Sequence, residues 1–170
     1  MDAVRNGYSE IGVDNYYIKH KDDYRNPHSL VISEILKSEG LCGNVLDLCC
    51  GSGEVTTSLS GCNVVGCDPY TYNLYIKNTD CNCFCYDFKE ISQGALRSEG
   101  LFFDVIVCSF ALHLCPLSLL PLVLYELSCI SNRLIILSPH KRPYIKNYWK
   151  LNRSYVYKRV HFREYLKNYD

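Results

Sequence analysis

Two aspartates, each at the end of a short apolar segment, are the residues whose type and spacing best suit ligand chemistry. Asp47 precedes the glycine-rich turn 49–53 (CCGSG), and Asp68 ends the segment 63–67 (NVVGC). A strand that leads into such a turn is typical of nucleotide-binding elements, because glycine lets the backbone approach a ligand. A carboxylate about 20 residues further on can accept hydrogen bonds from both hydroxyls of a ribose. Capping of the next helix is the alternative interpretation of Asp68.

The charge of Asp47 narrows the kind of ligand. A dinucleotide would place its pyrophosphate at the turn, where the carboxylate would repel it. The turn lacks the third glycine of the dinucleotide motif, since Thr56 stands there, and no Lys-Ser/Thr pair follows it as in a phosphate-binding loop. The pattern therefore favours a cationic ligand.

Two stretches resemble a known family. Residues 47–53 (DLCCGSG) resemble motif I of the class I S-adenosylmethionine (SAM)-dependent methyltransferases, D-x-G-x-G-x-G, with Cys49 in place of the first glycine. The C-C-G-S-G version is similar to the ubiquinone- and menaquinone-type members. Residues 103–113 (FDVIVCSFALH) resemble motif IV of the small-molecule and ubiquinone-type members. The resemblance implies a Rossmann-like fold that binds SAM, whose ammonium and sulfonium suit the carboxylate of Asp47.

The resemblance also implies a set of cofactor contacts at the ends of the predicted strands. These are Asp47, Cys49, Gly51, Gly53, Asp68, Pro69, Asp87, Phe88, Ser109 and Phe110. In relatives, the acid at the position of Asp87 faces the adenine amino group, and Tyr86 or Phe88 could pack on the purine. His113 follows the fourth strand as a candidate general base for the acceptor. Packing beneath the cofactor is the alternative role for this histidine.

Composition and charge argue against several classes of protein. The 170 residues carry 18 basic and 18 acidic side chains, so a strong general attraction for nucleic acid is absent. The sequence contains no apolar run of about 18 residues, so no transmembrane helix is predicted, and the N-terminus has no apolar signal core. We therefore expect a cytoplasmic protein, and the same features also fit a nuclear one.

The 11 cysteines do not predict a disulfide framework, because their number is odd and the fold is of an intracellular type. Cys81, Cys83 and Cys85 alternate, which on a strand would place all three on one face. A structural zinc site is one interpretation. Buried thiols that act as small apolar side chains are the favoured one, so no metal is predicted.

Helical and strand patterns alternate from residue 29 onward. Helices are predicted over 29–39, 54–60 and 116–128, and strands over 45–48, 63–68, 81–86, 103–109, 133–138 and 155–162. This alternation predicts an α/β fold with a mostly parallel, doubly wound sheet and a short C-terminal part. Few residues follow the fifth strand, so the last two strands of a Rossmann-like methyltransferase fold must be short, or one must be missing.

We expect a single domain with three parts. Residues 29–143 form the SAM-binding core, and 144–170 supply the C-terminal strands and cover. The tyrosines of 1–28 are interpreted either as a lid over the cleft or as cover for a hydrophobic edge of the protein.

These observations predict a SAM-dependent methyltransferase whose acceptor is a small molecule, an RNA or a protein. Asn-Pro-Pro-Tyr is absent after the fourth strand, which argues against methylation of adenine or glutamine amino groups by enzymes with that motif. One alternative is a methyltransferase-like subunit that supports a protein partner without catalysis. Another is an RNA-binding module, because 144–170 interleaves aromatic and basic residues.

Overall fold

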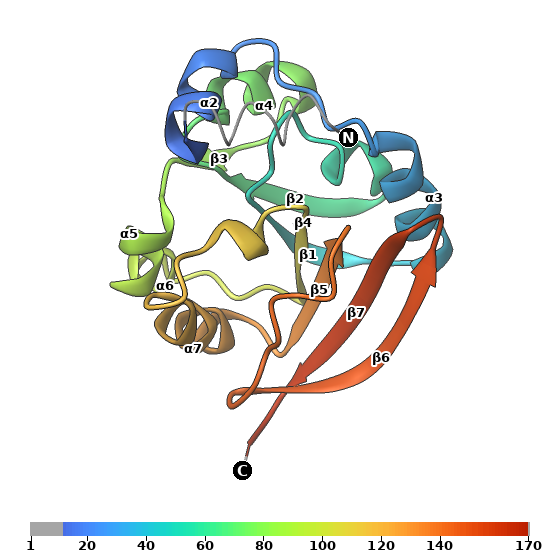
Figure 1. The fold of residues 1–170 in the computed structure, drawn as a ribbon, viewed down its shortest axis with the longest axis vertical. Helices are drawn as coiled ribbons and strands as arrows, with labels where there is room; N and C mark the ends of the chain where they lie inside the picture. The colour runs from blue at the N-terminus through green and yellow to red at the C-terminus, as the bar shows by residue number, and fades with distance from the viewer. Residues whose placement is uncertain (1–11, 170) are drawn as a thin grey trace.

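A seven-stranded sheet forms the centre of the computed structural model, which describes residues 12–169 (Figure 1). The strands are β1 (Gly43–Leu48), β2 (Cys62–Cys67), β3 (Cys83–Phe84), β4 (Val105–Ser109), β5 (Arg133–Ser138), β6 (Trp149–Tyr157) and β7 (Val160–Lys167). The α-helices are α2 (Val13–His20), α3 (Ser29–Glu39), α4 (Tyr72–Thr79), α5 (Phe88–Ser92), α6 (Ala95–Ser98) and α7 (Leu120–Ile130). Two short 3₁₀ helices are η1 (Thr56–Ser58) and η2 (Leu112–Leu114).

The order of the strands creates a crevice between β1 and β4. The sheet runs β3-β2-β1-β4-β5-β7-β6, and β1 to β5 pair in parallel. The chain leaves β1 toward β2 and β3 and then returns to place β4 on the other side of β1. Ligands of open α/β sheets bind at the carboxyl ends of the strands at such a reversal. The mostly parallel, doubly wound sheet is therefore confirmed, and it locates the candidate site.

Each face of the sheet is covered by a separate apolar layer. Along β4, Val105 and Val107 join the layer beneath α3, whereas Ile106 and Cys108 join the layer beneath α7. All four are almost completely buried. Burial on both faces explains why β4 reads as a continuous apolar run in the sequence. Each large apolar side chain of this kind contributes roughly 1.5–3 kcal/mol to folding.

The predicted helix 54–60 is wrong, because only the 3₁₀ helix η1 forms there. The hydroxyl of Thr57 donates to the carbonyl of Gly53 at 3.0 Å, and that of Ser58 donates to Glu54 at 2.7 Å. Hydroxyls that bond nearby carbonyls weaken a helix as short as this one. The third strand is also shorter than predicted, and α7 begins later than predicted, at Leu120.

Both C-terminal strands are present and long, so the expectation of a short or missing strand is wrong. β6 has 9 residues and β7 has 8, and they form an antiparallel hairpin whose strand β7 pairs with β5. The chain is short at its C-terminal end because residues 139–148 connect β5 to β6 without a helix. Trp149 anchors the start of the hairpin by donating its ring N–H to the carbonyl of Leu124 at 2.9 Å.

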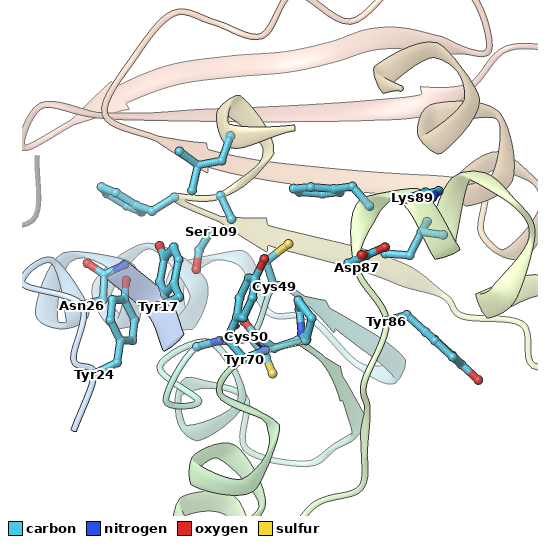
Figure 2. A pocket seen from close by; sticks show the side chains of 18 of the residues that line it. Tyr17, Tyr24, Asn26, Cys49, Cys50, Tyr70, Tyr86, Asp87, Lys89 and Ser109 are labelled. Atoms are coloured by element: carbon cyan, nitrogen blue, oxygen red, sulfur yellow. Dashed lines mark hydrogen bonds between the residues drawn. The ribbon is translucent and has the colours of Figure 1, made fainter. Parts of the chain in front are cut away.

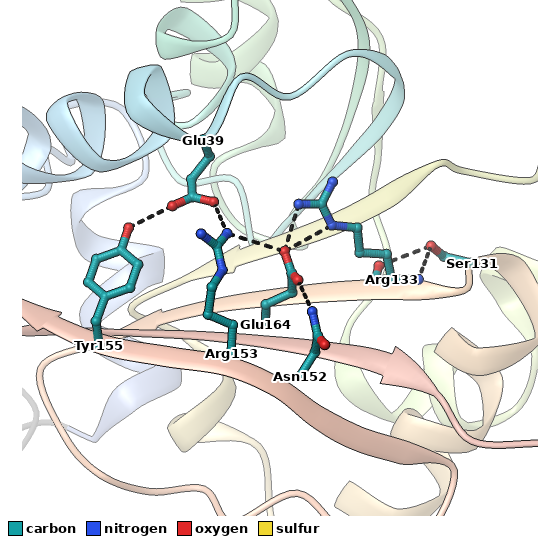
Figure 3. A network of polar contacts seen from close by, with 7 residues as sticks. All are labelled: Glu39, Ser131, Arg133, Asn152, Arg153, Tyr155 and Glu164. Carbon is teal, nitrogen blue, oxygen red and sulfur yellow. Dashed lines mark hydrogen bonds and ion pairs between the residues drawn. The ribbon is translucent and has the colours of Figure 1, made fainter.

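A network of charged side chains fastens this hairpin to α3 and β5 (Figure 3). The buried carboxylate of Glu164 accepts from Arg133 at 2.6 Å and lies 3.6 Å from a guanidinium nitrogen of Arg153. Glu39 of α3 accepts from Arg153 and, at 2.8 Å, from the hydroxyl of Tyr155. These contacts hold β6 and β7 in register with the rest of the sheet.

Candidate functional site

A cavity of about 380 Å³ opens at the carboxyl ends of β1, β2 and β4 (Figure 2). It is lined by Tyr17, Tyr24, Asn26, Cys49, Cys50, Gly51, Glu54, Asp68, Pro69, Tyr70, Tyr86, Asp87, Phe88, Lys89, Ile91, Ser109, Phe110, Ala111, Leu114, Pro116 and Leu119. The cavity therefore lies at the reversal of strand order described above.

The turn after β1 forms the floor of the cavity. Its first residue, Cys49, donates its backbone N–H to the carbonyl of Cys67 at 2.7 Å, which ties the turn to the end of β2. Gly51 has a φ of 56°, and a Cβ at this position would lie 3.0 Å from the ring of Tyr24. Glycine is thus required here both for its conformation and for the close approach of Tyr24.

Asp68 joins the ends of β1 and β2 through its carboxylate. Its Oδ1 accepts from the backbone N–H groups of Tyr70 and Thr71, both at 2.9 Å, and its Oδ2 accepts from Gly51 at 3.2 Å. Thr71 is the N-cap residue of α4, so the capping interpretation of Asp68 is met. Because Asp68 also lines the cavity, the remaining lone pair of Oδ2 can accept a further hydrogen bond from a ligand.

Asp47 lies beneath the floor of the cavity and is not part of its lining, in contrast to its predicted contact with the ligand. Its Oδ2 accepts from the backbone and the hydroxyl of Thr56, at 3.2 Å and 2.7 Å. The same hydroxyl lies 2.8 Å from that of Tyr75, while Oδ1 has no hydrogen-bond partner among the described residues. Burial raises the pKa of Asp47 to about 8, so the side chain supports the turn largely in its protonated form.

This buried acid should give the protein a measurable pH dependence. The folded-state pKa of about 8 exceeds the ordinary value of 3.8, so between these values the folded state binds the extra proton. The stability that Asp47 contributes is therefore lost as the pH rises through this window. Relative to Asp47→Asn, the wild type should lose about 3 kcal/mol of unfolding free energy between about pH 5 and about pH 7.5.

Urea unfolding of both proteins at the two pH values measures this difference. Asp80→Asn, which removes an exposed acid at the end of α4, is the matched control and should follow the wild type. Parallel pH profiles for wild type and Asp47→Asn would show that Asp47 is ionised throughout.

Asp87 lies at the opposite end of the cavity from Tyr24 (Figure 2), and its neighbour in the chain, Phe88, also lines the cavity. Asp87 is the N-cap of α5. Its Oδ1 accepts from the backbone N–H of Glu90 at 2.8 Å, and Oε2 of Glu90 accepts from the backbone N–H of Asp87 at 2.9 Å. This capping box fixes the carboxylate at the mouth of the cavity. Phe88 supplies an apolar wall beside it, together with Ile91.

Residues from the N-terminal segment form the other end of the cavity. Tyr17 of α2 stacks on Tyr70, with ring centroids 5.8 Å apart, and Tyr24 lies against Tyr17 at 5.3 Å. Glu54 accepts from the backbone of Asn26 at 2.8 Å and so joins this segment to the turn after β1. The described part of the predicted lid lies at the cavity, and residues 1–11 fall outside the described part of the chain.

Residues 46–127, which include the end of β1, the floor of the cavity and β2 to β4, match the family model of the methyltransferase domain. This part of the chain therefore resembles a methyltransferase domain. An uncharacterised protein of Schizosaccharomyces pombe is 28% identical over 227 aligned positions, which cover 95% of this chain and 90% of that protein.

Solved structures share the fold of this chain. The magnesium protoporphyrin IX methyltransferase of Synechocystis, with bound SAM, has a TM-score of 0.62 at 18% identity, covering 97% of this chain and 95% of that one. The N-methyltransferase NodS of Bradyrhizobium japonicum, in complex with S-adenosylhomocysteine (SAH), has a TM-score of 0.63 at 14% identity, covering 98% and 99%. At these identities the similarity shows the fold and leaves the acceptor open.

Most of the residues that the sequence assigned to the cofactor line the cavity. Asp47 and Gly53 do not. Gly53 packs closely against Thr79 instead, since a Cβ at this position would lie 2.4 Å from Thr79 Cγ2. Lining residues that the sequence analysis did not assign are Asn26, Cys50, Glu54, Tyr70, Lys89, Ile91, Ala111, Leu114, Pro116 and Leu119. Of these residues, only Glu54 could have been identified from the sequence, because it directly follows motif I.

His113 lies in η2 and does not line the cavity. Its Nδ1 is buried without a hydrogen-bond partner among the described residues, and its ring meets that of His140 edge-on with centroids 5.4 Å apart. Burial, and then the charge of His140, lowers the pKa of His113 to about 4. A general base works best with a pKa near the working pH, so the geometry favours the packing interpretation over catalysis.

The buried imidazole of His113 should make the protein sensitive to acid. In the unfolded chain it binds a proton near its ordinary pKa of 6.5, whereas in the folded state it does so only near 4. Stability is therefore lost as the pH falls through this window. On acidification from about pH 7 to about pH 5, the melting temperature of the wild type should fall more steeply than that of His113→Phe.

Calorimetry at both pH values measures the two slopes. Equal slopes, combined with a loss of methyl transfer in the variant, would instead support the role of His113 as the base.

In residues 12–169 no cluster of three or more His, Cys, Asp or Glu side chains has the arrangement of a metal site. Cys83 and Cys50 lie 3.6 Å apart through their sulfur atoms, and all 11 cysteines are free thiols. Within the same part of the chain, the helices lack the length and apolar character needed to cross a bilayer.

Proposed function

We propose that this protein binds SAM in the cavity and transfers its methyl group to a nucleophilic acceptor. The observation that carries the proposal is the position of Asp68. Its carboxylate meets the glycine turn at the reversal of strand order and keeps hydrogen-bonding capacity on the cavity side. This is the arrangement that a ribose requires in folds of this type.

The residues of the cavity fit the three parts of SAM. Asp68 can accept from the ribose hydroxyls, and Asp87 can accept from the adenine amino group beside the apolar wall of Phe88. At the other end, Glu54 supplies a carboxylate for the ammonium of the methionine part. SAM contributes an electrophilic methyl on its sulfonium, so the protein needs no nucleophile of its own.

The role of the chain is to position the two reactants and to exclude water. The turn 49–53 and Asp68 hold the floor rigidly, while Tyr17 and Tyr24 close the end near the N-terminal segment. Alignment of a nucleophile with a methyl group can lower the barrier by roughly 7–11 kcal/mol. We propose that residues 12–28 act as a lid that closes over the bound reactants.

Thermal unfolding with and without ligand tests the cofactor. SAM and SAH at about 100 times their dissociation constants should each stabilise the protein by about 2.7 kcal/mol. For a chain of this length, the melting temperature should then rise by roughly 5–10 °C. NAD is the matched control and should produce no shift, since the carboxylate of Glu54 in the lining and the missing third glycine of the turn disfavour its pyrophosphate. An equal rise with NAD, or none with SAM at millimolar concentration, would contradict the proposal.

Methyl transfer is then measured with labelled SAM against pools of small molecules, tRNA, rRNA and proteins. Labelled product distinguishes an enzyme from a subunit that binds SAM without turnover.

A further inference from the structure

The carboxyl end of β5 carries a cluster of basic side chains outside the cavity. His140, Lys141 and Arg142 follow Pro139 after the end of β5, and all three are exposed. His161 of β7 pairs with the last residue of β5, and His113 contacts the ring of His140. Four of these residues, His140, Lys141, Arg142 and His161, are called the basic corner below, and the buried ring of His113 packs against it.

Arg163 fixes the loop that carries the basic corner. Its guanidinium donates to the carbonyl of Pro143 at 3.0 Å, of His140 at 3.2 Å and of Arg142 at 3.3 Å, and also to that of Lys141. The loop therefore turns its carbonyls toward Arg163 and leaves the side chains of Lys141 and Arg142 at the surface. The basic side chains start from a backbone that is already held in place, which limits the entropy lost when a ligand binds.

No carboxylate neutralises the basic corner within residues 12–169, since none of its members takes part in the ion pairs of this part of the chain. Burial lowers the pKa of His161, and the charges of Arg163, Lys141 and His140 lower it further. The positive groups are thus close enough to act on one another. An anion placed among them would relieve this repulsion.

The other basic residues near the C-terminal hairpin are in a different situation. Arg133, Arg153 and Lys158 are paired with Glu164, Glu39 and Glu34. Two of these residues, Arg153 and Lys158, belong to the stretch 144–170 that suggested RNA binding from the sequence. The basic corner gathers a few basic side chains in one place, which suits a single anionic group better than an extended nucleic acid backbone.

The basic corner lies beside the cavity. His113 is next in the chain to Leu114 and two residues from Ala111, and both of these line the cavity. Phe110, also in the lining, donates its backbone N–H to Leu137 near the end of β5 at 2.7 Å. Phe110 of the lining is therefore held next to the end of β5.

We propose that the basic corner binds a carboxylate or phosphate group of the methyl acceptor, which is thus an anionic small molecule. The inference rests on the proposed function, because it assigns one part of the acceptor. Carboxylate and phosphate oxygens accept several hydrogen bonds at once, and Lys141, Arg142 and His140 supply charged or polar donors in one place.

A titration of the full chain with inorganic phosphate, and separately with acetate, tests the anion site without an acceptor. At constant ionic strength, the imidazole NMR signals of His140 and His161 should shift in a saturable manner. Lys141→Gln/Arg142→Gln should bind at least tenfold more weakly, and it keeps the backbone carbonyls that hold Arg163. The control, Lys146→Gln/Lys150→Gln, removes two exposed lysines outside the basic corner and should bind as the wild type does.

Unsaturable shifts, or equal affinities in the two double variants, would overturn the anion site. Binding of a single-stranded oligonucleotide that tightens with length and weakens in the control variant would show an RNA surface instead, and would also overturn it. Whichever of phosphate and acetate binds more tightly indicates which group the acceptor carries.

Matched pairs of acceptors then separate this inference from the proposed function. Each pair consists of a carboxylic acid and its amide, or of a phosphomonoester and its alcohol, incubated with labelled SAM. The anionic member should be methylated at least tenfold faster, and this preference should disappear in Lys141→Gln/Arg142→Gln. Faster methylation of the neutral members would overturn the anion site while supporting the proposed function. Absence of SAM binding would contradict the proposed function, and the phosphate titration would still decide the anion site.

Discussion

Asp68→Ala should lower the affinity for SAM by between tenfold and a hundredfold. The substitution removes the acceptor for the ribose, and hydrogen bonds to a charged group contribute about 1.5–3 kcal/mol each. A change of about 1.4 kcal/mol is a factor of ten in affinity. The alanine substitution also leaves the backbone N–H groups of Gly51, Tyr70 and Thr71 without their acceptor. The floor of the cavity should therefore loosen as well as lose a ligand contact.

Asp68→Asn separates these two effects. Its amide oxygen can still accept from Tyr70 and Thr71, which preserves the start of α4, but its NH₂ group would face the N–H of Gly51. We expect the asparagine variant to keep most of its stability. Its affinity for SAM should lie between that of the wild type and that of the alanine variant. Asp80→Asn removes one surface charge elsewhere and should bind SAM normally.

Titration calorimetry of SAM against these variants, with urea unfolding of each, measures both quantities. Equal affinities in wild type, asparagine and alanine variants would limit Asp68 to capping α4. The cofactor proposal would then lose the observation on which it depends.

Gly66→Ala should destabilise the fold by about 3 kcal/mol or more. An added Cβ would lie 2.7 Å from two ring atoms of Tyr75 and 2.9 Å from the sulfur of Cys50. Tyr75 is completely buried and close to the hydroxyl of Thr56, so its ring has little room to move. Overpacking of a rigid core typically costs about 1–3 kcal/mol, and here two neighbours are affected at once. The melting temperature should fall by roughly 6–12 °C.

The control for this prediction is Gly61→Ala. Gly61 has a φ of 82° with nothing within 4 Å of an added Cβ, so that variant has backbone strain without a clash. The double variant Gly66→Ala/Tyr75→Leu should be more stable than the sum of its single changes predicts, because the smaller side chain removes the contact. Additive effects in urea unfolding would show that the clash with Tyr75 is not the cause.

The positions of Ser109 and Phe110 illustrate what patterns along the chain can predict. Both follow β4, whose continuous apolar run marks it as a buried parallel strand, and the carboxyl ends of parallel strands lie at one edge of the sheet. They line the cavity as expected. Asp47 shows the limit of the same reasoning. Its place at a strand end was evident, but whether its side chain points into the cavity or beneath the turn depends on Thr56 and Tyr75.

The C-terminal part could not be deduced for a related reason. The short stretch after β5 suggested a missing strand, whereas the structure retains both strands and omits the helix between β5 and β6. The choice depends on how β7 pairs with β5 and on the contacts of Glu164 with Arg133 and Arg153, which join residues far apart in the chain.

The sequence by itself determined the strand-turn-acid elements at 45–53 and 63–68, the α/β fold and the edge of the sheet where a ligand would bind. These depend on neighbours along the chain, through apolar periodicity and glycine conformation. Only the tertiary structure decided which side chains meet at that edge. Tyr17 and Tyr24 reach the cavity, and His140 joins His113, because docking of distant segments places them there. Burial and charge at such contacts set the pKa values of Asp47 and His113, and therefore the chemistry of which each is capable.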